Sequence, residues 1–264
     1  MLTLVPLFFL FGWMLPADFL AVPFRIPQQV PKGIPLSMVE DSIDDMYFGC
    51  QTEMMEKVQK NYLRKEMRNQ EFKKAWSRAA KCATKKPDGE DKALTKAHMQ
   101  AICVYSRNDI YKMFNDAVRT QGPDYQTTFK FHSLHFLLTS AVQILNQDHH
   151  CHTTYRRTES TFTGRVNERI RFGAFASSSY KTDLTRFGHQ TCFKIQTCFG
   201  ADLKNYPVLG DHEKEVLIPP YETFKVTKKS TGQDIDKELE DCEVVYELKS
   251  VGIVSRLNCK AVTS

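Results

Sequence analysis

Two glutamates, Glu213 and Glu215, have the residue types and spacing that best suit chemistry in this chain. They stand two residues apart in DHEKEVLIPPYETF, directly before the apolar run 216–218. Residues two apart in an extended strand project from the same face, so the carboxylates would share one site and Lys214 would point the other way. Such a pair could be catalytic, for example by countering a developing positive charge. A solvated acidic strand end is the alternative interpretation.

Histidines offer a second place to look for chemistry. The string DHHCHTTY surrounds Cys151 with histidines, and His132 and His135 stand at helical spacing. Adjacent residues cannot all converge on one ion, and no second ligand pair occurs at C-x-x-C or H-x-x-x-H spacing. The two helical histidines fit ordinary, partly buried positions better than a metal site. We therefore expect no metal.

The elements that must position these residues fall into two halves. Apolar residues at spacings of three and four predict helices over 53–83, 92–120 and 131–145, and Asn108 and Asp109 could break the second helix. Runs rich in Thr, Phe, Tyr, Val and Ile then predict strands at 153–156, 170–176, 191–198, 215–218, 222–228 and 243–257. The chain is thus predicted to be α+β, with a mainly helical half over 41–150 packed on an antiparallel β half over 151–260.

Several classes of function are disfavoured by what the sequence lacks. There is no Gly-rich strand-to-helix turn of the dinucleotide-binding type and no G-x-x-x-x-G-K, so a nucleotide would need another kind of site. The net charge of +5 comes with no basic and aromatic groove pattern, so no nucleic-acid partner is expected.

The ends of the 264-residue chain and its cysteines predict a secreted protein. Residues 1–22 form a short, interrupted apolar block that predicts a cleaved signal peptide and no transmembrane segment. Residues 23–40 are proline-rich and predict an extended lead-in, followed by a single domain over 41–264. No apolar tail of the lipid-anchor type follows Cys259. All eight cysteines follow the signal and suggest disulfides, whose pairing the sequence alone leaves open.

Three pieces of the β half together match a known signature. Arg156 lies in TTYRRT, Ser177 in RFGAFASSS, and the two glutamates in HEKEVLIPPYE. In this combination the chain resembles the vertebrate ecto-type, arginine-specific mono-ADP-ribosyltransferases over roughly residues 41–259. The resemblance implies a disulfide-stabilised β-sandwich core of the ADP-ribosyltransferase type. It also implies transfer of ADP-ribose from NAD, as co-substrate, to arginine-containing protein acceptors.

The resemblance implies a role for each motif residue. Glu215 would bond a ribose hydroxyl and counter the oxocarbenium-like charge as nicotinamide leaves. Arg156 would hold the nicotinamide-side ribose and the diphosphate, and Ser177 would orient Glu215. Glu213 would bind the acceptor guanidinium. Taken alone, Arg156 would fit a surface ion pair and Ser177 a turn hydroxyl.

Other site residues follow from the same resemblance. Tyr105 and Phe187 occupy positions where the family has aromatics near NAD, although core packing explains them equally well. Arg157 stands where the family usually has glycine, beside the nicotinamide amide. Because an arginine is larger and less free in its backbone, we expect weaker NAD binding or a reoriented side chain.

The resemblance also implies two disulfides, Cys50 with Cys259 and Cys151 with Cys198. For the four cysteines outside that pattern, we expect the pairs Cys82–Cys103 and Cys192–Cys242. Two other functions stay open: an NAD glycohydrolase, in which water replaces the arginine, and a catalytically weak secreted binding protein of the same fold.

Overall fold

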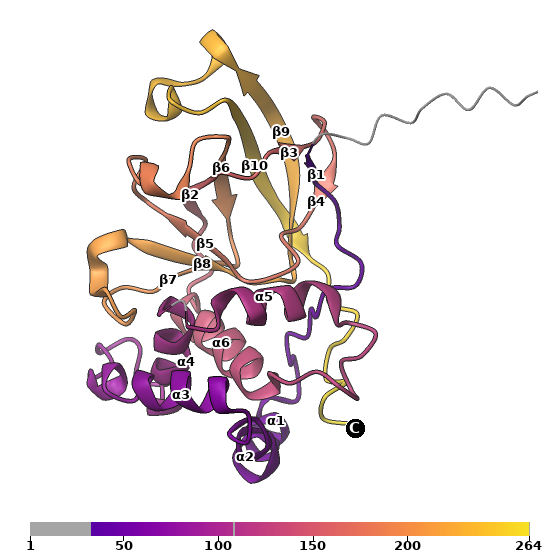
Figure 1. The fold of residues 1–264 in the computed structure, drawn as a ribbon, viewed down its shortest axis with the longest axis vertical. Helices are drawn as coiled ribbons and strands as arrows, with labels where there is room; N and C mark the ends of the chain where they lie inside the picture. The colour runs from indigo at the N-terminus through magenta and orange to yellow at the C-terminus, as the bar shows by residue number, and fades with distance from the viewer. Residues whose placement is uncertain (1–32, 108, 264) are drawn as a thin grey trace, which may run out of the picture. The chain divides into compact units, whose positions relative to one another are not determined.

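The helices occupy the first half of the chain, as the apolar spacing predicts. The structure, a computed structural model, describes residues 33–107 and 109–263. The helices are α1 (Gln51–Lys57), α2 (Leu63–Glu66), α3 (Gln70–Ala79), α4 (Lys96–Ser106), α5 (Tyr111–Thr120) and α6 (His132–Leu145). In Figure 1 they lie together below the strands.

The first helical run, expected over 53–83, is divided. A π-helical turn, Val58–Tyr62, separates α1 from α2, and α3 starts afresh after Asn69. The Asn69 side chain accepts hydrogen bonds from the backbone N–H groups of Glu71 and Phe72 at 2.9 and 3.0 Å. An asparagine that caps free N–H groups favours a new helix start over continuation of the old one. The run 92–120 also divides, between α4 and α5, as Asn108 and Asp109 suggest.

The strands follow in the second half and form one large sheet. They are β1 (Ile34–Pro35), β2 (His152–Thr158), β3 (Phe162–Thr163), β4 (Arg169–Ile170), β5 (Ala176–Ser179), β6 (Thr191–Thr197), β7 (Ala201–Asp202), β8 (Glu215–Ile218), β9 (Glu222–Thr231) and β10 (Val244–Ile253). The eight-stranded sheet has the order β4-β9-β10-β6-β2-β5-β8-β7, and β1 pairs with β3 separately. Within the large sheet β6 and β10 are parallel, and the other neighbours are antiparallel.

The prediction of one strand over 170–176 is wrong. Its ends belong to β4 and β5, and the residues between leave the sheet. Arg171 turns inward there, and its Nη1 donates to the buried Asp44 carboxylate at 2.7 Å. Gly173 has φ +67°, which a strand does not contain. The strand expected over 243–257 also stops earlier, at Ile253.

Two parts of the sheet pack against each other, and β2 and β5 join them through the single pair Tyr155 and Ser179. Ala176 and Ile218 of the β5–β8 part share a buried cluster with Phe193 and Phe224 of the larger part. A second, larger cluster joins the helices to the sheet and includes Leu217 of β8. These two clusters confirm the predicted α+β fold with a sandwich-like core.

Four disulfides brace this architecture. They are Cys50–Cys259, Cys82–Cys103, Cys151–Cys198 and Cys192–Cys242, the pairs expected above. The first joins the start of α1 to the end of the chain across 209 residues. The expected signal peptide and most of the lead-in lie outside the described residues. In the described ranges, no helix is both long enough and apolar enough to cross a membrane.

Candidate active site

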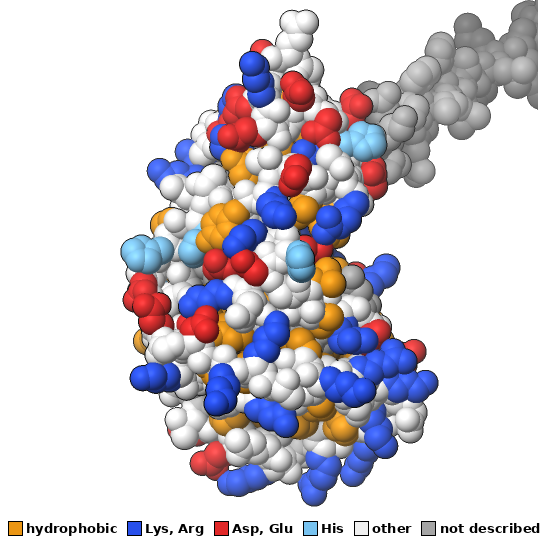
Figure 2. All heavy atoms as spheres, turned by 90° about the vertical axis from the view of Figure 1, so that its left-hand side faces the viewer, with side chains coloured by type: hydrophobic (Ala, Val, Ile, Leu, Met, Phe, Trp, Pro, Cys, Tyr) orange, Lys and Arg blue, Asp and Glu red, His pale blue; other side chains and the backbone are white. Residues whose placement is uncertain are grey.

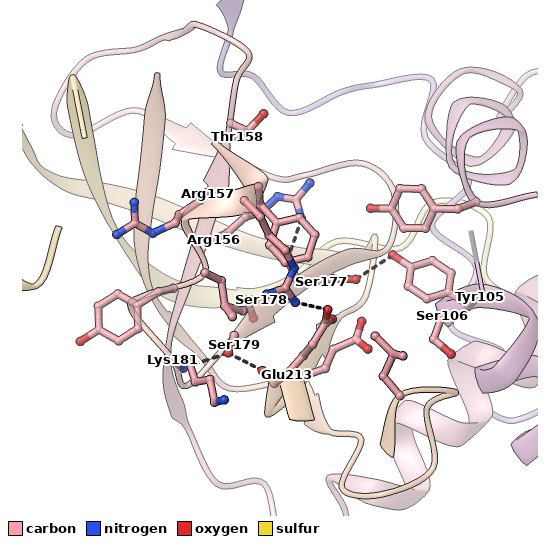
Figure 3. A pocket seen from close by; sticks show the side chains of 17 residues that line it. Tyr105, Ser106, Arg156, Arg157, Thr158, Ser177, Ser178, Ser179, Lys181 and Glu213 are labelled. Atoms are coloured by element: carbon pink, nitrogen blue, oxygen red, sulfur yellow. Dashed lines mark hydrogen bonds and ion pairs between the residues drawn. The ribbon is translucent and has the colours of Figure 1, made fainter. Parts of the chain in front are cut away.

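A cavity of about 580 Å³ opens where β2, β5 and β8 meet α4. This is a usual size for a small-molecule site. Figure 3 shows its lining side chains, which come from strands, from the helices α4 and α5, and from loops with two short 3-10 turns. The lining includes every motif residue singled out in the sequence: Tyr105, Arg156, Arg157, Ser177, Phe187, Glu213 and Glu215.

Glu215 is the buried acid of this cavity. It is the first residue of β8, lies opposite Ser179 of β5, and is 7% exposed. Burial raises the pKa of Glu215 to about 7, with a smaller contribution from the neighbouring Glu213 charge. Hydrogen bonding from Ser177 and the charge of Arg156 act in the opposite direction. The carboxyl therefore exchanges its proton near neutral pH.

Arg156 and Ser177 are neighbours across β2 and β5. The Nη1 of Arg156 donates to the backbone carbonyl of Ser177 at 2.6 Å. The Ser177 hydroxyl lies 3.5 Å from the Tyr105 hydroxyl, which itself donates to the Phe175 carbonyl at 3.0 Å. The arginine is thus anchored at one nitrogen, and its remaining N–H groups can serve a ligand.

Glu213 reaches the same cavity by a route that the strand pattern did not predict. It ends the 3-10 turn Gly210–Glu213, and Lys214 has φ +47°, so β8 begins only at Glu215. The expectation that one strand carries both acids is therefore wrong, although both face one cavity. The Ser179 hydroxyl donates to the Glu213 carbonyl at 2.5 Å and fixes this turn. Lys214 instead pairs with Asp211.

The two expected aromatic residues both line the cavity but differ in burial. Tyr105 of α4 is 1% exposed and contacts Tyr111 and Phe175, so it packs in the core while its edge lines the cavity. Phe187 lies at the mouth, in the 3-10 turn Thr185–Phe187, and is 46% exposed. Only Phe187 is therefore free to cover a ligand without moving the core.

Arg157 is among the lining residues, but its guanidinium points away from the cavity. Figure 3 shows its guanidinium on the side of β2 remote from Ser177 and Glu213. There its Nη1 and Nη2 donate to the Asp241 carboxylate at 2.7 and 2.9 Å, which lowers the pKa of Asp241. The backbone φ of Arg157 is not positive, so the position does not require a glycine conformation. Of the two outcomes expected for this position, the side chain is reoriented, and its backbone needs no glycine.

Sequence reasoning missed two charged residues of the lining, Lys181 and Arg186. Arg186 forms an ion pair with Glu213, and its guanidinium carbon lies 4.7 Å from the centre of the Phe187 ring. The residue stands beside Phe187 in the string RFG, but nothing in that spacing indicates a partner 27 residues later.

The histidines carry no metal site in the part of the chain that the structure describes. No group of three or more His, Cys, Asp or Glu residues there could hold an ion. Cys151 is in a disulfide, and His135 is buried with its Nδ1 2.8 Å from the Tyr47 hydroxyl. Burial lowers the pKa of His132 and His135 to about 4 and about 3, so both are neutral core residues.

With this geometry described, comparison with known proteins decides the family. The model of the NAD:arginine ADP-ribosyltransferase family matches residues 36–242. The chain belongs to this family. Among its relatives, mouse (Mus musculus) ecto-ADP-ribosyltransferase 4 is 33% identical over 247 residues, covering 88% of this chain and 78% of the relative. Rat (Rattus norvegicus) ecto-ADP-ribosyltransferase 5 is 38% identical over 221 residues, covering 76% and 69%.

A solved ADP-ribosyltransferase shares the fold as well. The eukaryotic mono-ADP-ribosyltransferase ART2.2 superposes with a TM-score of 0.72 at 29% identity, covering 86% of this chain and 98% of that one. Variants of ART2.2 have been solved in complex with NADH and with NAD. The family's fold is therefore the fold of this protein.

Proposed function

We propose that this protein transfers ADP-ribose from NAD to arginine side chains of proteins and releases nicotinamide. The observation that carries this proposal is the convergence of a buried carboxyl, Glu215, an anchored cation, Arg156, and a second carboxylate, Glu213, on one cavity. Family membership and the NAD complexes of ART2.2 support NAD as the substrate.

Glu215 serves the bond that breaks. When the bond between the ribose C1′ and the nicotinamide nitrogen breaks, nicotinamide keeps the electron pair and positive charge develops on the ribose. An ionised Glu215 counters that charge, and its burial makes the interaction stronger than it would be in water. Ser177 orients the carboxylate, while Arg156 holds the ribose and the diphosphate with its free N–H groups.

Glu213 serves the acceptor. A guanidinium is always charged at neutral pH and needs a carboxylate to bind and orient it. The ion pair with Arg186 supports this role, because Glu213 already holds a guanidinium at the cavity. A guanidino nitrogen of the acceptor then bonds to C1′ and loses a proton, so the new bond replaces the bond to nicotinamide.

The setting of the reaction is extracellular or at the cell surface. Four disulfides favour an oxidising compartment. Several relatives are named ecto-enzymes, which supports the same location. We propose secretion, with arginine-containing proteins as acceptors and no nucleic-acid partner.

Incubation with NAD labelled in its ADP-ribose part and with a small guanidine tests the proposal. The wild-type protein should produce labelled ADP-ribosylguanidine and free nicotinamide. Glu215→Gln is the matched blank, because it keeps the shape and removes the charge. Equal turnover by Glu215→Gln would contradict the proposal.

NAD glycohydrolysis is a second candidate with its own observation. Arg186 forms an ion pair with the Glu213 carboxylate. A guanidine acceptor therefore has to compete with Arg186 for this carboxylate, whereas a water molecule does not. The third reading, a catalytically weak binding protein, depended on Arg157. The Arg157 guanidinium is held by Asp241, so this position gives that hypothesis little support.

A further inference from the structure

Arg157 makes a set of bonds that the proposed reaction does not use. Its side chain is 4% exposed, and the Asp241 carboxylate accepts from both terminal nitrogens at 2.7 and 2.9 Å. Its Nε donates to the backbone carbonyl of Thr182 at 2.8 Å. A planar guanidinium held at three nitrogens has a fixed orientation.

Thr182 is next in the chain to residues that form a wall of the cavity. It lies in the segment 180–189, here called the 180–189 loop, which connects β5 to β6. Lys181, Arg186 and Phe187 of this loop line the cavity. The bond to Thr182 therefore connects the far side of β2 to the wall that a ligand would contact.

The other partner, Asp241, belongs to a covalently braced part of the molecule. It precedes Cys242, whose disulfide partner Cys192 lies opposite Arg157 in the β2–β6 ladder. The Arg157 Nη1 lies 3.4 Å from the Cys242 sulfur. Arg157 is therefore linked to Asp241 both by the ion pair and through the β2–β6 ladder, the Cys192–Cys242 disulfide and the adjoining backbone. These links fix the position of the Arg157 side chain.

The far end of the 180–189 loop has its own attachments. A side chain at Gly188 would place its Cβ 2.4 Å from the backbone of Thr158, and Gly188 has φ +120°, so the loop is pressed against the end of β2. The Glu243 N–H donates to the His189 carbonyl at 2.8 Å. The end nearer Lys181 is held by the Tyr180 N–H, which donates to the Lys214 carbonyl at 3.2 Å, and by the Lys181 N–H, which donates to the Ser179 hydroxyl at 2.9 Å. The bond from Arg157 to Thr182 adds a side-chain support directly after these two residues.

We propose that Arg157 is a positioning residue for NAD binding: by joining Asp241 to Thr182, it holds the 180–189 loop with Lys181 and Phe187 facing the cavity. This inference takes its substrate from the proposed function. The sequence suggested that Arg157 weakens NAD binding and that glycine would improve it. The structure gives the opposite expectation, because Arg157→Gly would remove a support of the loop without opening more space in the cavity. The Arg157 Nη1 also lies 4.0 Å from the Cys192 sulfur, so the guanidinium contacts both cysteines of this disulfide.

The test compares Arg157→Gly, Asp241→Asn and the conservative Asp241→Glu with wild type. A loosened loop should weaken NAD binding more than it slows the chemical step. We therefore expect KM for NAD to rise about tenfold in the first two variants, while kcat changes less than about threefold. Hydrogen exchange at residues 181–187 should accelerate in the same two variants. Asp241→Glu keeps the carboxylate, so its KM for NAD and its exchange rate should stay close to those of wild type. Because Asp241 is 44% exposed, Asp241→Asn provides a folded variant even if Arg157→Gly does not fold.

Val226→Ala is the control for general destabilisation, because Val226 is buried in β9 and lies outside the cavity lining. It should lower Tm without changing KM for NAD. Unchanged loop exchange and unchanged KM in Arg157→Gly and Asp241→Asn would overturn the proposal. Hydrogen exchange and NAD titration by calorimetry need no turnover. Failure of wild type to bind NAD would therefore count against the proposed function, separately from the loop.

Discussion

At the scale of single residues, the site gives two acids different environments. Glu215 is buried and has a raised pKa, whereas Glu213 stands on a turn at the cavity and pairs with Arg186. Two carboxylates set in different environments can take different roles. The roles assigned to them can therefore be tested one residue at a time.

The pH dependence of the reaction should report Glu215. Its pKa of about 7 is raised by burial, so the ionised form, which we propose counters the ribose charge, accumulates as pH rises. We expect kcat/KM for NAD to increase with pH and to level off above about pH 7. Glu213→Gln should shift this profile to lower pH, because the Glu213 charge contributes to the raised pKa. Nicotinamide release measures both profiles, and a profile flat from pH 5.5 to 8.5 would refute the assignment.

Arg186 should compete with the acceptor for Glu213. The two side chains are 56% and 25% exposed, and an ion pair this accessible is worth up to about 1 kcal/mol. Arg186→Gln should therefore lower KM for a small guanidine about two- to fivefold, and added salt should reduce the difference. Arg186→Lys, which keeps the charge, is the control. A higher KM in Arg186→Gln would show that Arg186 helps to bind the acceptor.

At the scale of elements, the helical half contains a buried acid that couples α2 to α6. The Glu66 carboxylate accepts from the Ser133 N–H at 2.8 Å in the first turn of α6, and its other oxygen is buried without a partner. Burial raises the pKa of Glu66 to about 8. A protonated acid fits this site, since an ionised one would have an unsatisfied charge.

Glu66 should make stability fall at alkaline pH. The native state holds this proton up to about pH 8 and the unfolded state only to about pH 4.5, so the native state binds more protons in between. The unfolding free energy should decrease by about 2 kcal/mol from pH 6.5 to 8.5. Glu66→Gln, which keeps the acceptor oxygen, should remove that part of the slope in urea melts at each pH. Equal slopes in both proteins would contradict this account.

At the scale of the whole molecule, the described residues form one unit with an uneven charge distribution. On the face in Figure 2, Lys and Arg side chains gather mainly over the lower, helical part, whereas acidic side chains lie mainly above it. The disulfides hold both halves, with Cys82–Cys103 in the helices and two of the other three within the strand half. The site lies where the halves meet, so its geometry depends on both.

Local patterns predicted the helical regions, five of the ten strands in the described residues (β2, β6, β8, β9 and β10) and the motif residues, because apolar spacing and motif strings are local properties. Long-range partners escaped prediction. Arg171 leaves the expected strand for Asp44, 127 residues away, and Arg157 finds Asp241 84 residues later. The pairing of Arg186 with Glu213 likewise depends on how β5 and β8 are aligned. Residue identity indicated the chemistry, and the three-dimensional fold determined which residues meet.

The most direct test of the central claim is a product balance for wild type, Glu213→Gln and Glu215→Gln with NAD and a small guanidine. Nicotinamide, free ADP-ribose and ADP-ribosylguanidine are quantified together. We predict that wild type makes ADP-ribosylguanidine, that Glu213→Gln still releases nicotinamide but makes mainly free ADP-ribose, and that Glu215→Gln makes neither. Intact guanidine transfer by Glu213→Gln, or undiminished nicotinamide release by Glu215→Gln, would contradict the division of roles between the two acids.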